Sequence, residues 1–215
     1  MIRVILWDID NTLLSFNKAE VAAFTREFQE FGIGEFTEEL LKDYSVINKR
    51  RWQALERGEM TKPEVTVGRF VEFFGLIGVD TSIAAAFDRR YQELLGEYIY
   101  FNDDGYEIIK DLKGKVLQCA TTNGTKIAQT GKLKNSGLGE LFDFVFISED
   151  VGAEKPAKEF FDKVLADIEA KIGKFQLDEV LLVGDSLTSD IKGANNAGVK
   201  SCWYNPDGVP CDKDV

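Results

Sequence analysis

The sequence predicts an α/β protein, with a doubly wound parallel sheet of the Rossmann-like kind and an inserted bundle of α-helices. Two observations predict this class. Short apolar runs rich in Val, Ile and Leu recur along the chain and alternate with helical patterns after about residue 100. Between residues 17 and 100 only helical patterns occur. We therefore expect an α/β core formed by residues 1–16 and 101–215, and an α-helical cap domain formed by residues 17–100.

Five runs have the length and composition of strands buried in a parallel sheet. They cover residues 2–7, 115–120, 144–148, 179–184 and 199–204. A helix is expected after Pro156, because apolar side chains recur along one helical face at positions 161, 164, 165, 168 and 172. Weaker helical patterns cover residues 127–135 and 188–197, and Gly198 is a suitable stop for the second.

The inserted segment is predicted to be helical throughout. An apolar stripe is followed by helical patterns over residues 37–56, 63–74 and 81–98; the stripe consists of Val21, Phe24, Phe28 and Phe31. Other aromatic side chains either form the core of the insert or stack against a nucleobase; these are Trp52, Phe70, Phe73 and Phe74. The basic run at residues 49–51 either lies on a solvated helix face or attracts an anionic substrate.

The composition excludes several classes of function. The 215 residues carry 26 Lys and Arg against 37 Asp and Glu, a net charge of −11, which disfavours binding to nucleic-acid polymers or to anionic membranes. No apolar run approaches the ~20 residues that a membrane span needs. The chain has no histidine, which excludes Ser-His-Asp and Cys-His catalysis. The three widely spaced cysteines indicate reduced thiols and a cytoplasmic protein.

Polar side chains follow each of the first four predicted strands. They are Asp8, Asp10 and Thr12 after the first strand, Thr122 and Asn123 after the second, Lys155 after the third, and Asp185 and Asp190 after the fourth. Any one of them alone could be a helix cap or a strand terminator. Ligands of open α/β sheets, however, bind beyond the carboxyl ends of the strands, so four such groups at one edge favour a functional site.

The chemistry of these groups suits a phosphorylated substrate. Asp8, Asp10 and Asp185 offer oxygen ligands for Mg²⁺, which would also relieve the repulsion between neighbouring acids. Lys155 adds a compact positive charge, and Thr122 with the backbone N–H groups that follow it suits a phosphoryl oxygen. Because histidine is absent, a carboxylate nucleophile is the natural covalent route.

In this order, the four groups resemble the motifs of the haloacid dehalogenase (HAD) superfamily, in its branch with a small helical cap. The matching positions are Asp8-x-Asp10-x-Thr12, Thr122-Asn123-Gly124, Lys155-Pro156 and Gly184-Asp185 with Asp190. The resemblance implies a Mg²⁺-dependent phosphatase in which Asp8 attacks phosphorus and Asp10 acts as acid and base. It also implies Mg²⁺ ligands from Asp8, Asp185 and the backbone carbonyl of Asp10, phosphate contacts from Thr122, Asn123 and Lys155, and supporting roles for Thr12 and Asp190.

Further segments are similar to those of bacterial pyrimidine 5′-nucleotidases. These are YSVINK at residues 44–49 with Trp52, GEMT at 58–61, ISEDVG at 147–152 and CWYN at 202–205. This resemblance implies hydrolysis of UMP, dUMP or dTMP. Alternatives on the same scaffold remain open: a sugar-phosphate or phosphoglycolate phosphatase, a phosphomutase, or a non-catalytic binding protein. The expected partner is a small phosphorylated metabolite, and the second acid, Asp10, favours a phosphohydrolase over a dehalogenase.

Overall fold

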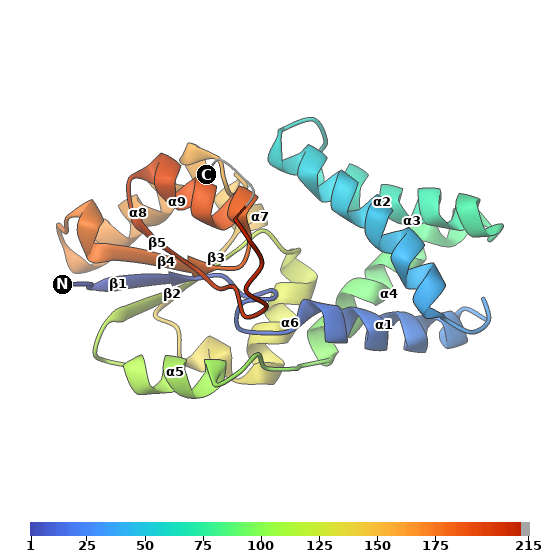
Figure 1. The fold of residues 1–215 in the computed structure, drawn as a ribbon, viewed down its shortest axis with the longest axis horizontal. Helices are drawn as coiled ribbons and strands as arrows, with labels where there is room; N and C mark the ends of the chain where they lie inside the picture. Colours follow the sequence, from blue (N-terminus) through green and yellow to red (C-terminus); the bar gives the residue numbers. More distant parts are fainter. Residues whose placement is uncertain (212–215) are drawn as a thin grey trace.

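The computed structural model describes residues 1–211, in which five strands form one parallel sheet (Figure 1). The strands are β1 (Val4–Trp7), β2 (Leu117–Thr122), β3 (Phe144–Ile147), β4 (Val180–Gly184) and β5 (Lys200–Trp203). Their order is β3-β2-β1-β4-β5, and every neighbouring pair is parallel. The predicted class is confirmed, since each of the five predicted runs supplies one of these strands.

Helices cover both faces of the sheet, and the alternation of side chains along β1 decides which helix packs on which face. Val4 and Leu6 point into a core with α8 (Lys158–Ile172) and α9 (Lys192–Ala197). Ile5 and Trp7 point to the opposite face, into a core with α5 (Gly105–Leu112) and α6 (Lys126–Ser136). Both faces of the central strand are therefore buried under helices, as its uninterrupted apolar sequence predicts.

The structure departs from the predicted elements in four places. Helix α5 was not predicted, because eight residues hold too few turns for a clear helical pattern. Strand β2 runs two residues beyond its predicted end and finishes at Thr122. The helix predicted over residues 188–197 is instead a π-helical turn (Leu187–Ile191) followed by α9, which ends at Gly198 as predicted. A further short helix, α7 (Ser148–Val151), follows β3.

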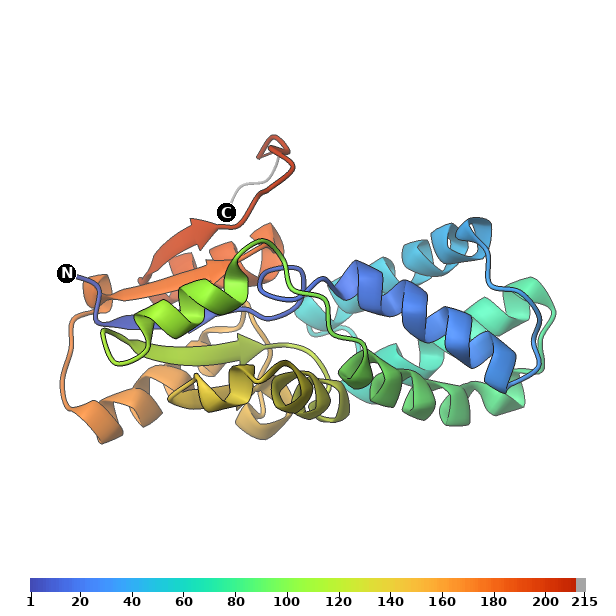
Figure 2. The ribbon, with the colours of Figure 1, turned by 90° about the horizontal axis from the view of Figure 1, so that it is seen from below.

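The remaining four helices form a bundle beyond the carboxyl ends of the strands, which a quarter turn shows equally well (Figures 1 and 2). They are α1 (Phe16–Glu30), α2 (Glu38–Glu56), α3 (Lys62–Ile77) and α4 (Ala84–Glu97). Phe70, Phe73 and Phe74 are fully buried in its aromatic core, so the interpretation as core is right for these three rings. The division into two domains at residues 16/17 and 100/101 stays a prediction.

One acid is buried within this helical bundle. Glu27 on α1 is fully buried, and neither of its carboxyl oxygens has a hydrogen-bond partner among the described residues. Burial raises the pKa of Glu27 to about 9. Folding therefore binds a proton at this side chain between pH 4.5 and pH 9, so its effect on stability becomes less favourable as the pH rises through that window.

Replacing Glu27 with an apolar residue should consequently stabilise the protein. Glu27→Met is expected to raise the free energy of unfolding at pH 8 by about 2 kcal/mol and to flatten its decline between pH 5 and pH 9. Urea unfolding at a series of pH values measures both quantities. The exposed Glu169→Met serves as the control and should change neither. A lower stability of Glu27→Met at pH 8 would contradict the argument.

The bundle touches the sheet layer where α4 crosses α6. Gly96 and Gly131 face each other at this crossing: a Cβ atom on Gly131 would lie 2.8 Å from the Cα of Gly96, closer than carbon atoms approach without a clash. The two helix backbones are therefore in direct contact. Gly131 sits in the middle of α6, where glycine is otherwise unfavourable, so the close approach explains its presence.

Alanine at this crossing should therefore destabilise the protein, although alanine ordinarily favours a helix more than glycine does. Gly131→Ala is expected to lower the free energy of unfolding by about 1–3 kcal/mol, because the helices must separate. Gly75→Ala on α3 is the matched control, since nothing lies within 4 Å of its added Cβ atom. Helix propensity alone should then raise stability by about 0.5–1 kcal/mol. Thermal or urea unfolding of the two variants compares them, and the same sign in both would refute the close-contact explanation.

Candidate active site

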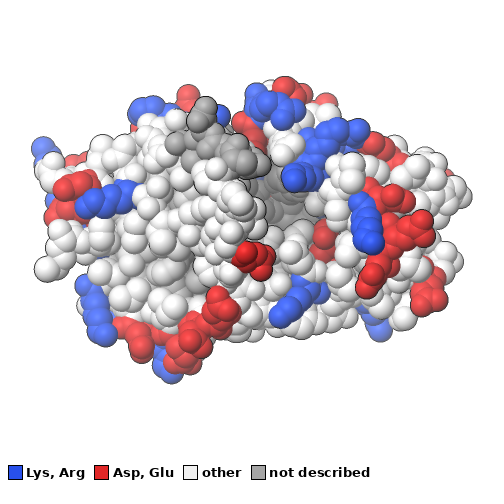
Figure 3. Space-filling model, in the orientation of Figure 1, with Lys and Arg blue, Asp and Glu red and all other residues white. Residues whose placement is uncertain are grey.

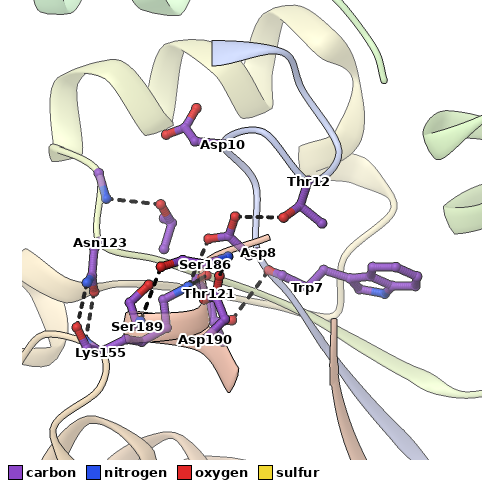
Figure 4. A network of polar contacts seen from close by, with 12 residues as sticks. Trp7, Asp8, Asp10, Thr12, Thr121, Asn123, Lys155, Ser186, Ser189 and Asp190 are labelled. Carbon is purple, nitrogen blue, oxygen red and sulfur yellow. Dashed lines mark hydrogen bonds and ion pairs between the residues drawn. The ribbon is translucent and has the colours of Figure 1, made fainter. Parts of the chain in front are cut away.

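Asp8 lies directly after β1, at the floor of the edge where the strands end (Figure 4). Its side chain is held at both oxygens: Lys155 Nζ donates to Oδ1 at 2.8 Å and Thr12 Oγ1 donates to Oδ2 at 3.0 Å. The Thr12 hydroxyl in turn accepts a hydrogen bond from the Asp185 N–H. Thr12 thus fixes the orientation of Asp8 and ties the loop after β1 to the loop after β4.

Lys155 is the buried cation next to Asp8, with 1% of its side chain exposed. Besides Asp8, its ammonium donates to Asp190 Oδ1 at 2.6 Å and to the Thr121 carbonyl at 2.8 Å. Burial alone would lower the pKa of Lys155, but the Asp190 and Asp8 carboxylates outweigh burial and raise the pKa above its ordinary value. Lys155 therefore stays charged throughout the neutral range.

Three carboxylates converge beside this lysine. Oxygens of Asp8, Asp185 and Asp190 all lie within 4.8 Å of one another. Burial raises the pKa of Asp185 to about 7, and the neighbouring Asp190 carboxylate contributes to the increase. Burial likewise raises the pKa of Asp8, although the Lys155 charge opposes it. Three acids against one ammonium leave an excess of negative charge on oxygen donors, which fits a hard divalent cation.

The carboxylates considered from the sequence as metal ligands were those of Asp8, Asp10 and Asp185, and the observed cluster differs from them in one member. Asp190, predicted as a supporting residue, lies in the cluster and is almost fully buried, with its Oδ2 accepting a hydrogen bond from the Ser186 N–H. The carboxylate of Asp10 is not part of it. The predicted ligand from Asp10, its backbone carbonyl, stays a prediction.

The Asp10 side chain points away from Asp8 and toward α6 (Figure 4). Gln129 Nε2 donates to Asp10 Oδ2 at 2.6 Å, and Lys132 Nζ forms an ion pair with Asp10 Oδ1. Both partners are almost fully buried. Neither residue was predicted as part of the site, although their spacing of three residues places two long polar side chains on one face of a helix that directly follows a predicted site loop.

Thr122 and Asn123 hold the loop that follows β2. Thr122 Oγ1 accepts a hydrogen bond from the Gly124 N–H at 3.0 Å. The Asn123 amide pairs with the Lys155 backbone in both directions, at 2.7 and 2.8 Å, and so positions the lysine main chain. The Asn123 side chain is thereby occupied, and a phosphate contact from Thr122 or Asn123 stays a prediction.

The bundle also reaches this edge through Lys62, at the start of α3. Its ammonium donates to the Asn123 carbonyl at 2.9 Å and to Ser148 Oγ at 2.6 Å, and lies 3.2 Å from a Glu154 carboxylate oxygen. Lys62 is largely buried and was not predicted as a site residue. No local pattern distinguishes it from a surface lysine, because its partners come from two distant loops.

A cavity of about 230 Å³ lies between the bundle and the strand ends. Its lining includes Asp8, Asp10, Thr122, Asn123, Lys155, Asp185 and Asp190 from the sheet side, and Asn48, Trp52, Glu56 and Arg69 from the bundle. The space-filling view shows the hollow between the two parts (Figure 3). Of the basic run at residues 49–51, Arg50 and Arg51 both form ion pairs with Glu72 on α3.

A parallel α/β sheet that collects carboxylates at its carboxyl edge around a buried lysine, Lys155, beneath a helical bundle, defines a hydrolase of the HAD type. The chain belongs to the family of haloacid dehalogenase-like hydrolases, which matches residues 5–204. The family resemblance drawn from the sequence motifs is confirmed. No helix among the described residues has both the length and the apolarity to span a membrane.

Several proteins are similar to this chain over nearly its whole length. HAD-hydrolase YfnB of Bacillus subtilis is 36% identical, covering 97% of this chain and 86% of YfnB. A crystal structure of YfnB bound to magnesium has a TM-score of 0.89, covering 97% of this chain and 91% of that one. Pyrimidine 5′-nucleotidase PynA of Streptococcus pneumoniae is 36% identical, covering 95% of this chain and 84% of PynA. Pyrimidine 5′-nucleotidase YjjG of Escherichia coli is 29% identical, covering 95% and 89%.

Proposed function

We propose that this enzyme is a Mg²⁺-dependent phosphomonoester hydrolase that works through an aspartyl-phosphate, and that its substrates are pyrimidine nucleoside 5′-monophosphates. The observation that carries the proposal is Asp8, a carboxylate at the floor of the cavity, oriented by Lys155 and Thr12 and flanked by Asp185 and Asp190. A nucleophile, a fixed positive charge and a cation site are thus gathered around one point.

The proposed first step transfers the phosphoryl group to Asp8. One Asp8 carboxylate oxygen forms a bond to phosphorus while the bond from phosphorus to the ester oxygen breaks. Asp10, as the carboxylic acid, gives its proton to that oxygen, so the substrate leaves as an alcohol. Lys155 and the N–H groups after Thr122 hold the phosphoryl oxygens. In the second step Asp10 takes a proton from water, whose oxygen attacks phosphorus, releasing phosphate and restoring Asp8.

Asp10 must change its contacts to perform these steps. Its carboxylate lies against Gln129 and Lys132 on α6, yet Asp10 also lines the cavity. Turning from α6 toward the cavity would bring it to the leaving oxygen. Asp8, Asp185 and Asp190 would hold Mg²⁺ together with the Asp10 carbonyl, and the bound ion would neutralise charge on the phosphoryl group.

The pyrimidine nucleotide assignment rests on the two related nucleotidases and on the cavity. PynA and YjjG are pyrimidine 5′-nucleotidases. Trp52 and Asn48 line the bundle side of the cavity, where a flat ring with polar edges could lie. We also propose a cytoplasmic location, in line with the reduced cysteines expected from the sequence and with a small phosphorylated metabolite as the partner.

The test is phosphate release from a panel of UMP, dTMP, ribose 5-phosphate and phosphoglycolate, with Mg²⁺ and with EDTA. We expect release that is fastest on UMP or dTMP and that falls at least about 100-fold in EDTA. Faster release from the sugar phosphate or phosphoglycolate would leave a phosphatase but remove the pyrimidine assignment. Transfer between sugar phosphates without free phosphate would indicate a mutase, and binding without turnover would indicate a non-catalytic protein.

A further inference from the structure

The bundle side of the cavity carries one amide whose direction is fixed by its surroundings. Arg69 on α3, with 2% of its side chain exposed, donates from Nη1 to Asn48 Oδ1 at 3.0 Å. A guanidinium has only donors, so the Asn48 oxygen must face Arg69. The Asn48 NH₂ group then points the other way. Among the described residues it has no hydrogen-bond partner, although Asn48 lines the cavity.

Arg69 itself is held by further contacts within the bundle. Its Nη2 donates to Asp88 Oδ1 at 3.0 Å and its Nε donates to the Thr66 carbonyl at 3.0 Å. The guanidinium also lies over the rings of Phe70 and Tyr91, at 4.9 and 5.0 Å from their centres. A side chain held on so many sides presents Asn48 in a single orientation.

The same network continues to the loop on the sheet side. Gln92 Nε2 donates to Asp88 Oδ1 at 3.1 Å, so its Oε1 is left to accept from Thr125 Oγ1 at 2.5 Å. Thr125 stands at the N-terminal end of α6, immediately after the loop of Thr122 and Gly124. Buried hydrogen bonds therefore connect Asn48 with the loop expected to hold the phosphate, which fixes the base end of the cavity relative to its phosphate end.

Trp52 forms the second part of the cavity end where the base would lie, next to Asn48. It lies one helical turn after Asn48 on α2, so both side chains project from the same face of the helix into the same cavity. Leu95 from α4 adds an apolar wall. An aromatic surface, an apolar wall and one aimed NH₂ group suit a planar ring with a carbonyl oxygen at its edge.

We propose that Asn48 is the residue that determines base specificity: its Nδ2 donates a hydrogen bond to the carbonyl oxygen at position 4 of a pyrimidine whose ring lies against Trp52. This inference rests on the proposed function. Position 4 follows from geometry, because it lies across the ring from N1, where the sugar and its phosphate extend toward Asp8. Uracil and thymine carry an acceptor there, whereas cytosine carries an amino group that would face the Asn48 NH₂ group donor to donor.

The experiment compares kcat/KM for UMP and CMP, which share ribose and phosphate, so that their ratio isolates the base. The unmodified enzyme should prefer UMP at least tenfold. Asn48→Asp keeps an oxygen for Arg69 but offers an acceptor in place of the donor, and should shift the ratio at least tenfold toward CMP. Asn48→Ala offers neither and should bring the ratio close to one. Asn195→Asp on the surface adds the same charge and should leave the ratio unchanged.

The outcomes separate this inference from the proposed function. Hydrolysis of UMP with the same UMP-to-CMP ratio in Asn48→Asp and Asn48→Ala would overturn the role of Asn48 and leave the nucleotidase intact. Release of phosphate from ribose 5-phosphate but from neither nucleotide would overturn both the nucleotidase and the base contact. Thermal unfolding of each variant confirms that the ratios are measured on folded protein.

Discussion

Asp8→Asn is expected to abolish phosphate release, lowering kcat at least about 10⁴-fold on every substrate that the enzyme accepts. Asparagine has the size of aspartate, so the Thr12 contact and the backbone position are retained. Its amide, however, is not a nucleophile toward phosphorus. The loss should therefore appear in kcat, and it should persist at saturating substrate and Mg²⁺.

A matched substitution makes this loss interpretable. Asp111→Asn on the exposed surface of α5 is the same chemical change and should leave kcat unchanged. Trapping the phosphorylated protein with acid after a short incubation should label the unmodified chain and leave Asp8→Asn unlabelled. Residual turnover of Asp8→Asn within about tenfold of the unmodified enzyme would mean that another group, or water directly, attacks phosphorus.

Lys155→Met should be the most destabilising of the changes considered. Removing the ammonium leaves the buried carboxylates of Asp8 and Asp190 without their shared partner, and breaking a buried ion pair costs about 3–5 kcal/mol. Urea unfolding in EDTA measures the loss without a contribution from bound metal. Lys158→Met removes a lysine whose ion pair with Asp162 is exposed, and should cost less than about 1 kcal/mol.

A second change distinguishes charge from packing as the cause. Adding Asp190→Asn to Lys155→Met removes one of the two unpaired carboxylates, and should recover at least about 1 kcal/mol of the loss. If the double variant is no more stable than Lys155→Met, the lysine acts through the volume of its side chain, and the electrostatic explanation fails.

Much of this fold could be predicted from local sequence. The strand of Val4 to Trp7 is an uninterrupted apolar run, and such runs have few alternatives to a buried strand. The polar groups that follow the strands could be predicted for the same reason, since parallel topology brings all carboxyl ends to one edge. Asp8, Lys155, Asp185 and Asp190 are indeed neighbours in the structure.

The residues that were missed depend on contacts between distant helices. The spacing of Gln129 and Lys132 places them on one helix face, but it does not show that packing buries both against Asp10. Arg69 is buried because it pairs with Asp88 and packs against two aromatic rings. Such partners are determined by the packing of the bundle, which a pattern of 3.6 residues per turn does not specify.

The contact between Gly96 and Gly131 links the bundle to the helix that holds Asp10. Gly131 touches the bundle, and on the same helix Gln129 and Lys132, on either side of it, hold Asp10. The same segment of α6 therefore contacts both the bundle and the Asp10 side chain. Because the two backbones are in direct contact, any displacement of α4 would be passed to α6, the helix that carries the Asp10 contacts. A substitution at this crossing that separates the two helices should therefore also shift Gln129 and Lys132 relative to Asp10.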